Sequence, residues 1–306
     1  MLAALTGGTG GAKLIQGLSL ETGPEELVAI CNTGDHFVLH GLYISPDVDT
    51  ITYTLAGIAD TGKGWGIKED TFEVLEWLGK FGGETWFKLG DRDLATHITR
   101  SRLLKEGLGL CQITECIRKA LGVKASILPM SDDRIETRIV TPTEEISFQE
   151  YFVKRHWADE VRKVHFAGAE RSRPAPGVVD AIRGASGVIL CPSNPVTSIG
   201  PILAVPGIRS ALKETRAPVA AVSPIIRGAP VSGPADKLMA AVDMEVSAFG
   251  VAKAYADFLD LLVIAPEDQD HTARIEALGV KTAEKSIRMD SLDDKKRLAR
   301  ELLALL

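Results

Sequence analysis

The chain has 306 residues, is 45% hydrophobic and 25% charged, and carries a formal net charge of −6. These values are ordinary for a globular protein and leave room for one large domain or two smaller ones. The negative charge argues against a sequence-independent nucleic-acid binder, which needs a basic face. No apolar run reaches the roughly 18 residues of a membrane span, and the start lacks a signal-peptide pattern, so we expect a cytoplasmic protein.

The first predicted element is a buried strand over residues 1–5, which leads into a glycine-rich turn at 7–11 and a helix-like segment at 12–18. A strand, a glycine turn and a helix together present backbone N–H groups and a positive helix end to an anion. Neither the GxGxxG nor the GxxxxGK[ST] pattern is matched, because Lys13 is followed by Leu14. The turn therefore predicts an anion site with its ligand open. The alternative is the plain first turn of any α/β domain.

Polar turns follow the other predicted strands. Buried strands are predicted at residues 27–31, 188–191, 218–222 and 261–265. Asn32 begins the turn after the first of these, and Ser193 and Asn194 lie in the turn after the second. Ligands collect at the carboxyl edge of open parallel sheets. Because strands alternate with helices, we expect one α/β domain over residues 1–306 with a Rossmann-like, doubly wound, mainly parallel sheet.

Cysteine and histidine spacing gives little support for a zinc site. The four cysteines form no CxxC pair, so we expect reduced thiols and no structural zinc. His36 and His40 are four residues apart, a spacing that places two side chains on one helical face. No Glu follows the first histidine, as HExxH requires, so ordinary polar roles are favoured.

A helix start is predicted at Ser45-Pro46-Asp47, with a hydroxyl cap, a proline at the first helical position and an acid in the first turn. Asp49 lies two residues after Asp47. Residues two apart on a helix point to different sides, so these carboxylates would not share one metal ion. We assign Asp47 to the helix dipole and Asp49 to the chemistry.

Residues 56–125 are predicted to be a mostly helical insertion that holds three of the four tryptophans. Trp65 lies between glycines, a setting that often lines a pocket for a flat ring, although aromatic residues in helical regions more often belong to the core. The charged stretch 131–137 is interpreted as either an exposed hairpin or the polar wall of a site. Residues 291–306 are predicted to form a closing amphipathic helix.

Taken together, the motifs resemble those of one family, the 2-phospho-L-lactate transferases of coenzyme F-420 biosynthesis. The matching stretches occur in the family's order between residues 7 and 239, and so cover most of the chain. They are GGTGGAKL, NTGD, HGLYISPDVDTITYTLAG, GWG, TWFKLGDRDLATHI, DDRIET, FQEYFVKRH, RPAPGV, PSNPVTSIGPILAVPGIR, SPII and GPADKLM.

The resemblance implies a transferase of the phosphotransferase type (class 2.7.8), expected as a homodimer. Its acceptor is the deazaflavin Fo, and its donor is a guanosine diphospho-compound that carries lactate, enolpyruvate or a glyceryl acid. The ribityl hydroxyl of Fo attacks the phosphorus next to the three-carbon acid, GMP leaves, and Mg²⁺ assists. A glycine turn and a cation suit this chemistry, because charge builds up on phosphate oxygens.

By resemblance, Asp49 and Lys88 fall on the family's deazaflavin-binding positions, and Asp49 is the catalytic candidate. Trp65 and Trp86 are further acceptor-binding candidates, and the insertion at 56–125 is expected to form the acceptor pocket. The metal candidates are Asp49 and Asp35. The expected phosphate and nucleotide contacts are Gly7, Gly8, Thr9, Gly10, Gly11, Lys13, Asn32, Ser193, Asn194 and Arg227.

Two positions depart from the family pattern. The family commonly has an acid where this chain has His36, which would weaken the hold on a metal, and it commonly has Gly where this chain has Arg227. We hypothesise that Arg227 pairs with the donor and helps select its three-carbon acid, the alternative being an ordinary surface arginine. The main competing function is a regulatory protein that binds a nucleotide-linked metabolite without turnover. An NAD-dependent dehydrogenase is disfavoured, because the ribose-binding acid expected about 20 residues after the glycines has no clear counterpart that follows a strand at the right place.

Overall fold

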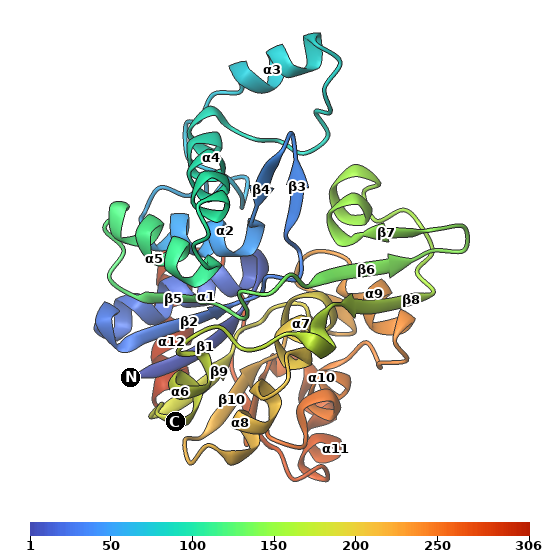
Figure 1. The fold of residues 1–306 in the computed structure, drawn as a ribbon. Helices are drawn as coiled ribbons and strands as arrows, with labels where there is room; N and C mark the ends of the chain where they lie inside the picture. Colours follow the sequence, from blue (N-terminus) through green and yellow to red (C-terminus); the bar gives the residue numbers. More distant parts are fainter.

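The computed structural model describes residues 1–306 and contains a central sheet of seven strands, all parallel, with helices on both faces (Figure 1). The strand order is β14-β13-β10-β9-β1-β2-β5. The strands are β1 (Leu2–Thr6), β2 (Leu27–Cys31), β5 (Ser126–Pro129), β9 (Gly187–Leu190), β10 (Val219–Val222), β13 (Leu261–Ile264) and β14 (Lys281–Glu284). Along the chain, strands are added first on one side of β1 (β2 and β5) and then on the other side (β9, β10, β13 and β14). The predicted doubly wound α/β fold is therefore confirmed, and its switch point lies between β1 and β9.

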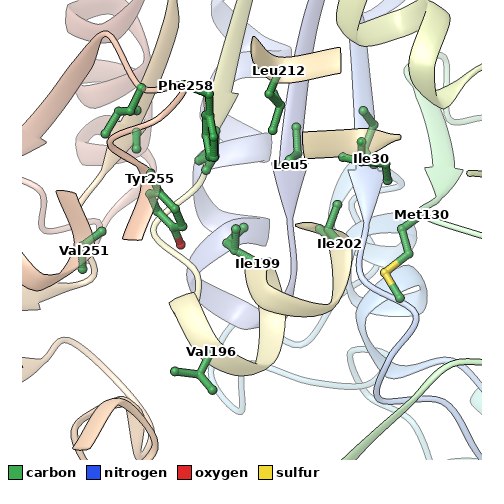
Figure 2. Close-up of a cluster of buried hydrophobic side chains, with 14 of the residues drawn as sticks. Leu5, Ile30, Met130, Val196, Ile199, Ile202, Leu212, Val251, Tyr255 and Phe258 are labelled. Carbon is green, nitrogen blue, oxygen red and sulfur yellow. The ribbon is translucent and has the colours of Figure 1, made fainter. Parts of the chain in front are cut away.

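Strand β1 is buried along its whole length because both faces of the sheet are covered. Its side chains alternate between two hydrophobic cores: Leu5 joins the larger one, and Leu2 joins the core beneath α1 (Gly8–Glu21) and α12 (Leu292–Leu303). Figure 2 shows part of the larger core, where Leu5 and Ile30 lie near Ile202.

Helix α1 begins earlier than the sequence indicated. We expected a glycine turn followed by a helix at 12–18, but the helix starts at Gly8, so the glycines form its first turn. Packing overrides the low helix propensity of glycine here. A Cβ at Gly10 would lie 2.5 Å from the carbonyl oxygen of Pro192, so only glycine lets α1 approach the end of β9 this closely.

The insertion between β2 and β5 contains a small hairpin and four helices that lie over one end of the sheet (Figure 1). The hairpin is β3 (Phe37–Leu39) with β4 (Leu42–Ile44), and the helices are α2 (Pro46–Leu55), α3 (Glu73–Lys80), α4 (Asp91–Lys105) and α5 (Leu110–Ala120). The predicted start of α2 is confirmed, although the Ser45 hydroxyl makes no capping hydrogen bond. Residues 56–72 and 81–90 lie outside the α-helices, so the insertion is less helical than expected.

The second half of the chain adds a separate antiparallel sheet, in the order β7-β6-β8. Its strands are β6 (Glu136–Val140), β7 (Glu145–Ser147) and β8 (Lys163–Ala167). The remaining elements are α6 (Val178–Arg183), α7 (Gly200–Ala204), α8 (Ile208–Glu214), the hairpin β11 (Ile225–Ile226) and β12 (Ala229–Pro230), α9 (Ala235–Ala241), α10 (Ala248–Tyr255) and α11 (Thr272–Glu276). The closing helix α12 is confirmed, and Ser291 and Asp294 form its capping box. None of the helices combines the length and apolarity needed to cross a membrane.

Candidate active site

The glycine turn meets the loop after β9 at the switch point. The N–H of Gly7 donates to Ser193 Oγ at 3.2 Å, and the Ser193 hydroxyl donates to the carbonyl oxygen of Gly7 at 2.7 Å. The structure therefore brings together two of the residues predicted to contact phosphate. Gly8 has a φ of +65°, a backbone conformation that favours glycine.

Asn32, at the end of β2, ties three segments together. Its Nδ2 donates to Asp47 Oδ2 at 2.9 Å and to the carbonyl oxygen of Thr197 at 3.2 Å, while its Oδ1 accepts from the N–H of Gly34 at 2.8 Å. We expected Asn32 to donate to a phosphate. In the structure its side-chain amide forms hydrogen bonds with other protein groups, so Asn32 positions the loops around the glycine turn.

Asn194 has a similar internal role. Its Oδ1 accepts from the N–H groups of Val196 at 2.9 Å and Thr197 at 3.3 Å, and so caps the π-helical segment Pro195–Ile199. This cap fixes the loop after β9 against the glycine turn. Asn194 therefore shapes the site through the backbone of its own loop.

Asp47 lies at the glycine turn, which corrects our assignment of this residue to the helix dipole alone. A Cβ at Gly7 would lie 2.6 Å from Asp47 Oδ2 and 2.9 Å from Ser198 Cβ, so the turn closes directly on this carboxylate. Burial raises the pKa of Asp47, while hydrogen bonds from Asn32 and the Gly8 N–H oppose the rise. The first turn of α2 thus delivers an acid to the glycine turn.

Asp35 supplies a second acid beside the first. It is 5% exposed, and its Oδ1 has no hydrogen-bond partner. Burial and the charge of Asp47 raise the pKa of Asp35 well above its usual range. Two buried carboxylates would repel a bare phosphate. With an unpartnered oxygen, however, they match the oxygen ligands that Mg²⁺ takes when it binds a phosphate. The residues present therefore fit this ion.

Asp49 faces away from the glycine turn, toward α4. It forms a buried ion pair with Arg100, and its Oδ2 lies 3.7 Å from His97 Nδ1. On the other side of the imidazole, His97 Nε2 lies 3.3 Å from Asp93 Oδ1, which accepts a hydrogen bond of 2.6 Å from the Tyr53 hydroxyl. Asp49, Asp93 and His97 are close enough to hold a metal ion. Arg100 engages Oδ1 of Asp49 and leaves Oδ2 without a hydrogen-bond partner, so we interpret the group as a network that locks α2 against α4 and keeps one carboxylate oxygen of Asp49 unpaired.

Sequence reasoning missed Arg100 and His97. The signal was present in the block TWFKLGDRDLATHI and its continuation, where Asp93, His97 and Arg100 follow the i, i+4, i+7 spacing of one helical face. Arg100 is only 1% exposed, and its Nε has no partner. A buried arginine on that face requires an acid opposite it, and Asp49 is that acid.

The predicted acceptor residues do not form one cluster. Trp65 lines a small cavity beside α1, together with Thr9 and Lys13. Trp86 stacks on Phe37, with ring centroids 5.7 Å apart. Lys88 is exposed. The role of these side chains in acceptor binding therefore stays a prediction.

A large cavity lies within the insertion, between α2, α4 and α5. Its volume is about 810 Å³, and nine of its fifteen lining residues are hydrophobic. Tyr53, Ile58, Leu103 and Ile117 contribute apolar surface, and Arg92 is among the charged residues. A cavity of this size and character is suited to an organic molecule with a flat apolar body.

Two further predictions concern single residues. Arg227 has a φ of +50° in the turn between β11 and β12, its N–H donates to Asp268 Oδ1 at 2.8 Å, and its side chain is exposed. A left-handed turn explains why glycine suits this position.

His36 and His40 do not share a helical face: His36 is buried beside Tyr43, and His40 has a φ of +52° in the β3–β4 hairpin. Burial, and then the charge of Arg100, lower the pKa of His36 well below its usual range.

Fold and site together define a class of protein. A doubly wound parallel sheet carries a glycine turn, two buried acids and two polar loops at its switch point, as in proteins that bind phosphorylated ligands at the carboxyl edge of such a sheet.

Comparison with known proteins identifies the family. The model of the 2-phospho-L-lactate transferase family, CofD, matches residues 2–304, and the chain belongs to this family of transferases. It is 44% identical to the phosphoenolpyruvate transferase of Kitasatospora aureofaciens, over 99% of this chain and 97% of that one. It is also 44% identical to the 2-phospho-L-lactate transferase of Methanothermobacter thermautotrophicus, with the same coverage of 99% and 97%. Relatives named for two different acids are thus equally similar, and identity does not distinguish between them.

A solved structure supports the fold. A member of the UPF0052 family from Bacillus halodurans superimposes with a TM-score of 0.63 at 17% identity, over 99% of this chain and 98% of that one.

Proposed function

We propose that the protein transfers a phospho-three-carbon-acid group from a guanosine diphospho-donor to the ribityl hydroxyl of the deazaflavin Fo. The hydroxyl oxygen forms a new bond to the phosphorus that carries the acid, and the bond from that phosphorus to the GMP phosphate breaks. GMP leaves, and the product is a phosphodiester precursor of coenzyme F-420. The acid is 2-phospho-L-lactate, phosphoenolpyruvate or the glyceryl equivalent.

The observation that carries the proposal is the pair Asp35 and Asp47 beside the glycine turn. A transferase of this type must hold a diphosphate and neutralise the charge on its leaving group. Asp35 and Asp47 would hold Mg²⁺, which when bound supplies that neutralisation. The N–H groups at the start of α1 would then bind the phosphate oxygens, and Ser193 holds the glycine turn in the conformation that presents them.

Helix α2 connects the donor site to the proposed acceptor site. Asp47 lies at the glycine turn, Tyr53 lines the cavity of about 810 Å³, and Asp49 lies between them in sequence. Six residues of helix span about 9 Å, which the flexible ribityl chain would bridge. Asp49 has one unpartnered oxygen, Oδ2, and burial raises its pKa, which suits a group that accepts the proton of the attacking hydroxyl. We therefore assign the deazaflavin ring to this cavity.

The direct experiment is incubation with Fo, Mg²⁺ and each of the three donors, followed by mass detection of product and GMP. We expect equal amounts of the two with at least one donor. Binding of the donor with no product from any of the three would instead favour the regulatory binding protein. A cavity variant, Ile117→Trp, should raise the KM for Fo and leave the affinity for GDP unchanged.

A further inference from the structure

A second, smaller cavity lies between α1, α2 and α12. Its volume is about 50 Å³, and three elements and a loop enclose it. Helix α1 contributes Lys13 and Gln16, and α12 contributes Lys295. Helix α2 lines it as well, and the loop after α2 contributes Asp60 and Trp65. Only three of its thirteen lining residues are hydrophobic.

Two lysines meet in this cavity without an acid between them. Lys295 is 9% exposed, its Nζ donates to Gln16 Oε1 at 2.8 Å, and Lys13 is half-buried beside it. Neither lysine takes part in any of the ion pairs in the structure. Burial, followed by the charge of Lys13, lowers the pKa of Lys295. Two neighbouring cations in a partly buried space are costly unless an anion lies between them.

The one acid of the cavity is already engaged. Asp60 pairs with Lys63 at 3.1 Å and accepts from the N–H groups of Gly62 and Lys63 at 3.0 Å each. It therefore holds its own loop and does not neutralise the two lysines. The remaining polar groups are hydroxyls and the Gln16 amide, which are donors that an oxyanion accepts from.

The volume of the cavity limits which ligand can enter it. A cavity of about 50 Å³ has room for a few waters or one tetrahedral oxyanion and is too small for a nucleotide. Beside Asp35 and Asp47, a phosphate would need a metal cation to offset the negative charge. In the cavity, Lys13 and Lys295 supply positive charge themselves. Trp65 lines the cavity and is 41% exposed, with Lys63 Nζ 5.7 Å from its ring centroid, so part of the indole is open to the remainder of a larger phosphorylated ligand.

The geometry points to a second oxyanion site, in which Lys13 and Lys295 bind a phosphate group without a divalent cation. The phosphate is either free or the phosphate end of a nucleoside monophosphate whose base lies against Trp65. This site is separate from the Asp35–Asp47 side of the turn, and its existence does not depend on the proposed transfer reaction.

The test is calorimetric titration of the full chain with inorganic phosphate in EDTA. We expect saturable binding that Lys295→Met weakens at least tenfold and that Lys13→Met weakens similarly. Lys296→Met removes the same charge from the adjacent position of α12 and should change the affinity less than twofold. Thermal unfolding of each variant checks that it is folded. Absence of phosphate binding by the wild type, or equal affinities of the Lys295→Met and Lys296→Met variants, would overturn the inference.

A second titration with GMP in EDTA identifies the source of the phosphate. If the ligand is a nucleotide, GMP binds more tightly than phosphate and Trp65→Phe removes the difference. If the ligand is free phosphate, the two affinities are equal and Trp65→Phe changes neither.

Discussion

The carboxylate of Asp47 accepts a hydrogen bond of 2.9 Å from the Asn32 amide, and this contact joins the start of α2 to the end of β2 at the glycine turn. It places a carboxylate where a site that binds phosphate without a metal ion would have a cationic side chain. The arrangement makes sense if a cation accompanies the phosphate, and Asp35, with its unpartnered oxygen, completes the pair. The first predictions concern this corner of the molecule.

Gly7→Ala should damage both stability and activity. The new Cβ would lie 2.6 Å from Asp47 Oδ2, and relieving this overlap costs about 1–3 kcal/mol of unfolding free energy. Urea denaturation measures the loss. Gly23→Ala is the matched control, because its φ of −59° is ordinary and its Cβ would meet nothing closer than 3.6 Å. Equal stability of the two variants would contradict the close packing of the turn.

Asp35→Asn should stabilise the metal-free protein at neutral pH. Because the pKa of Asp35 is raised in the folded state, its contribution to stability is fully present below its ordinary value of 3.8 and is lost as pH rises. The neutral amide avoids that loss. In EDTA at pH 7 we expect a rise in Tm of about 2–4 °C, the shift that roughly 1 kcal/mol produces in a large domain. The gain should disappear near pH 4.

The same variant tests the metal assignment. Mg²⁺ should raise the Tm of the wild type and have a much smaller effect on Asp35→Asn, because a ligand that binds only the folded state stabilises it. If Mg²⁺ raises both Tm values equally, Asp35 does not hold the ion.

Arg100→Met should be strongly destabilising, by about 3–5 kcal/mol, because it leaves the buried carboxylate of Asp49 without its partner. Adding Asp49→Asn should recover part of the loss, which a double-mutant cycle in urea would measure. Arg102→Met, on the same helix, removes an exposed pair with Glu106 and should cost less than about 1 kcal/mol. Similar losses for the two arginines would mean that the network does not lock α2 against α4.

Arg227→Gly separates conformation from donor choice. Glycine relieves the left-handed backbone at φ +50° and retains the N–H that bonds Asp268, so stability should stay within about 1 kcal/mol of the wild type. Arg227→Asn also tolerates this conformation and likewise removes the charge. If Arg227 helps to select the donor acid, both variants change the ranking of the three donors in the transfer assay. An unchanged ranking in both would leave Arg227 as a turn residue only.

The sequence predicted the fold well where burial is continuous. Strand β2 has the predicted bounds, and β9, β10 and β13 differ from prediction by one residue at one or both ends, because runs buried on both faces leave a clear apolar signal. The start of α1 was missed because its glycines are poor helix formers in isolation, and the loop after β9, far away in sequence, is what requires them.

The site was harder to predict for the same reason. Helical geometry correctly separated Asp47 from Asp49, but which of them faces the glycine turn depends on how α2 packs. Arg100, 51 residues after Asp49, decides this by engaging the second carboxylate. Trp65 and Trp86 were grouped by residue type, and the irregular connections of the insertion place them in different clusters.

The central claim is that the diphosphate and its cation lie between the glycine turn and the two acids Asp35 and Asp47. Anomalous scattering from a crystal grown with GDP and Mn²⁺ in place of Mg²⁺ tests it most directly. We predict one strong peak bridging Asp35, Asp47 and the phosphates, with those phosphates against the first turn of α1. A peak among Asp49, Asp93 and His97, or phosphates bound away from the glycines, would contradict the account.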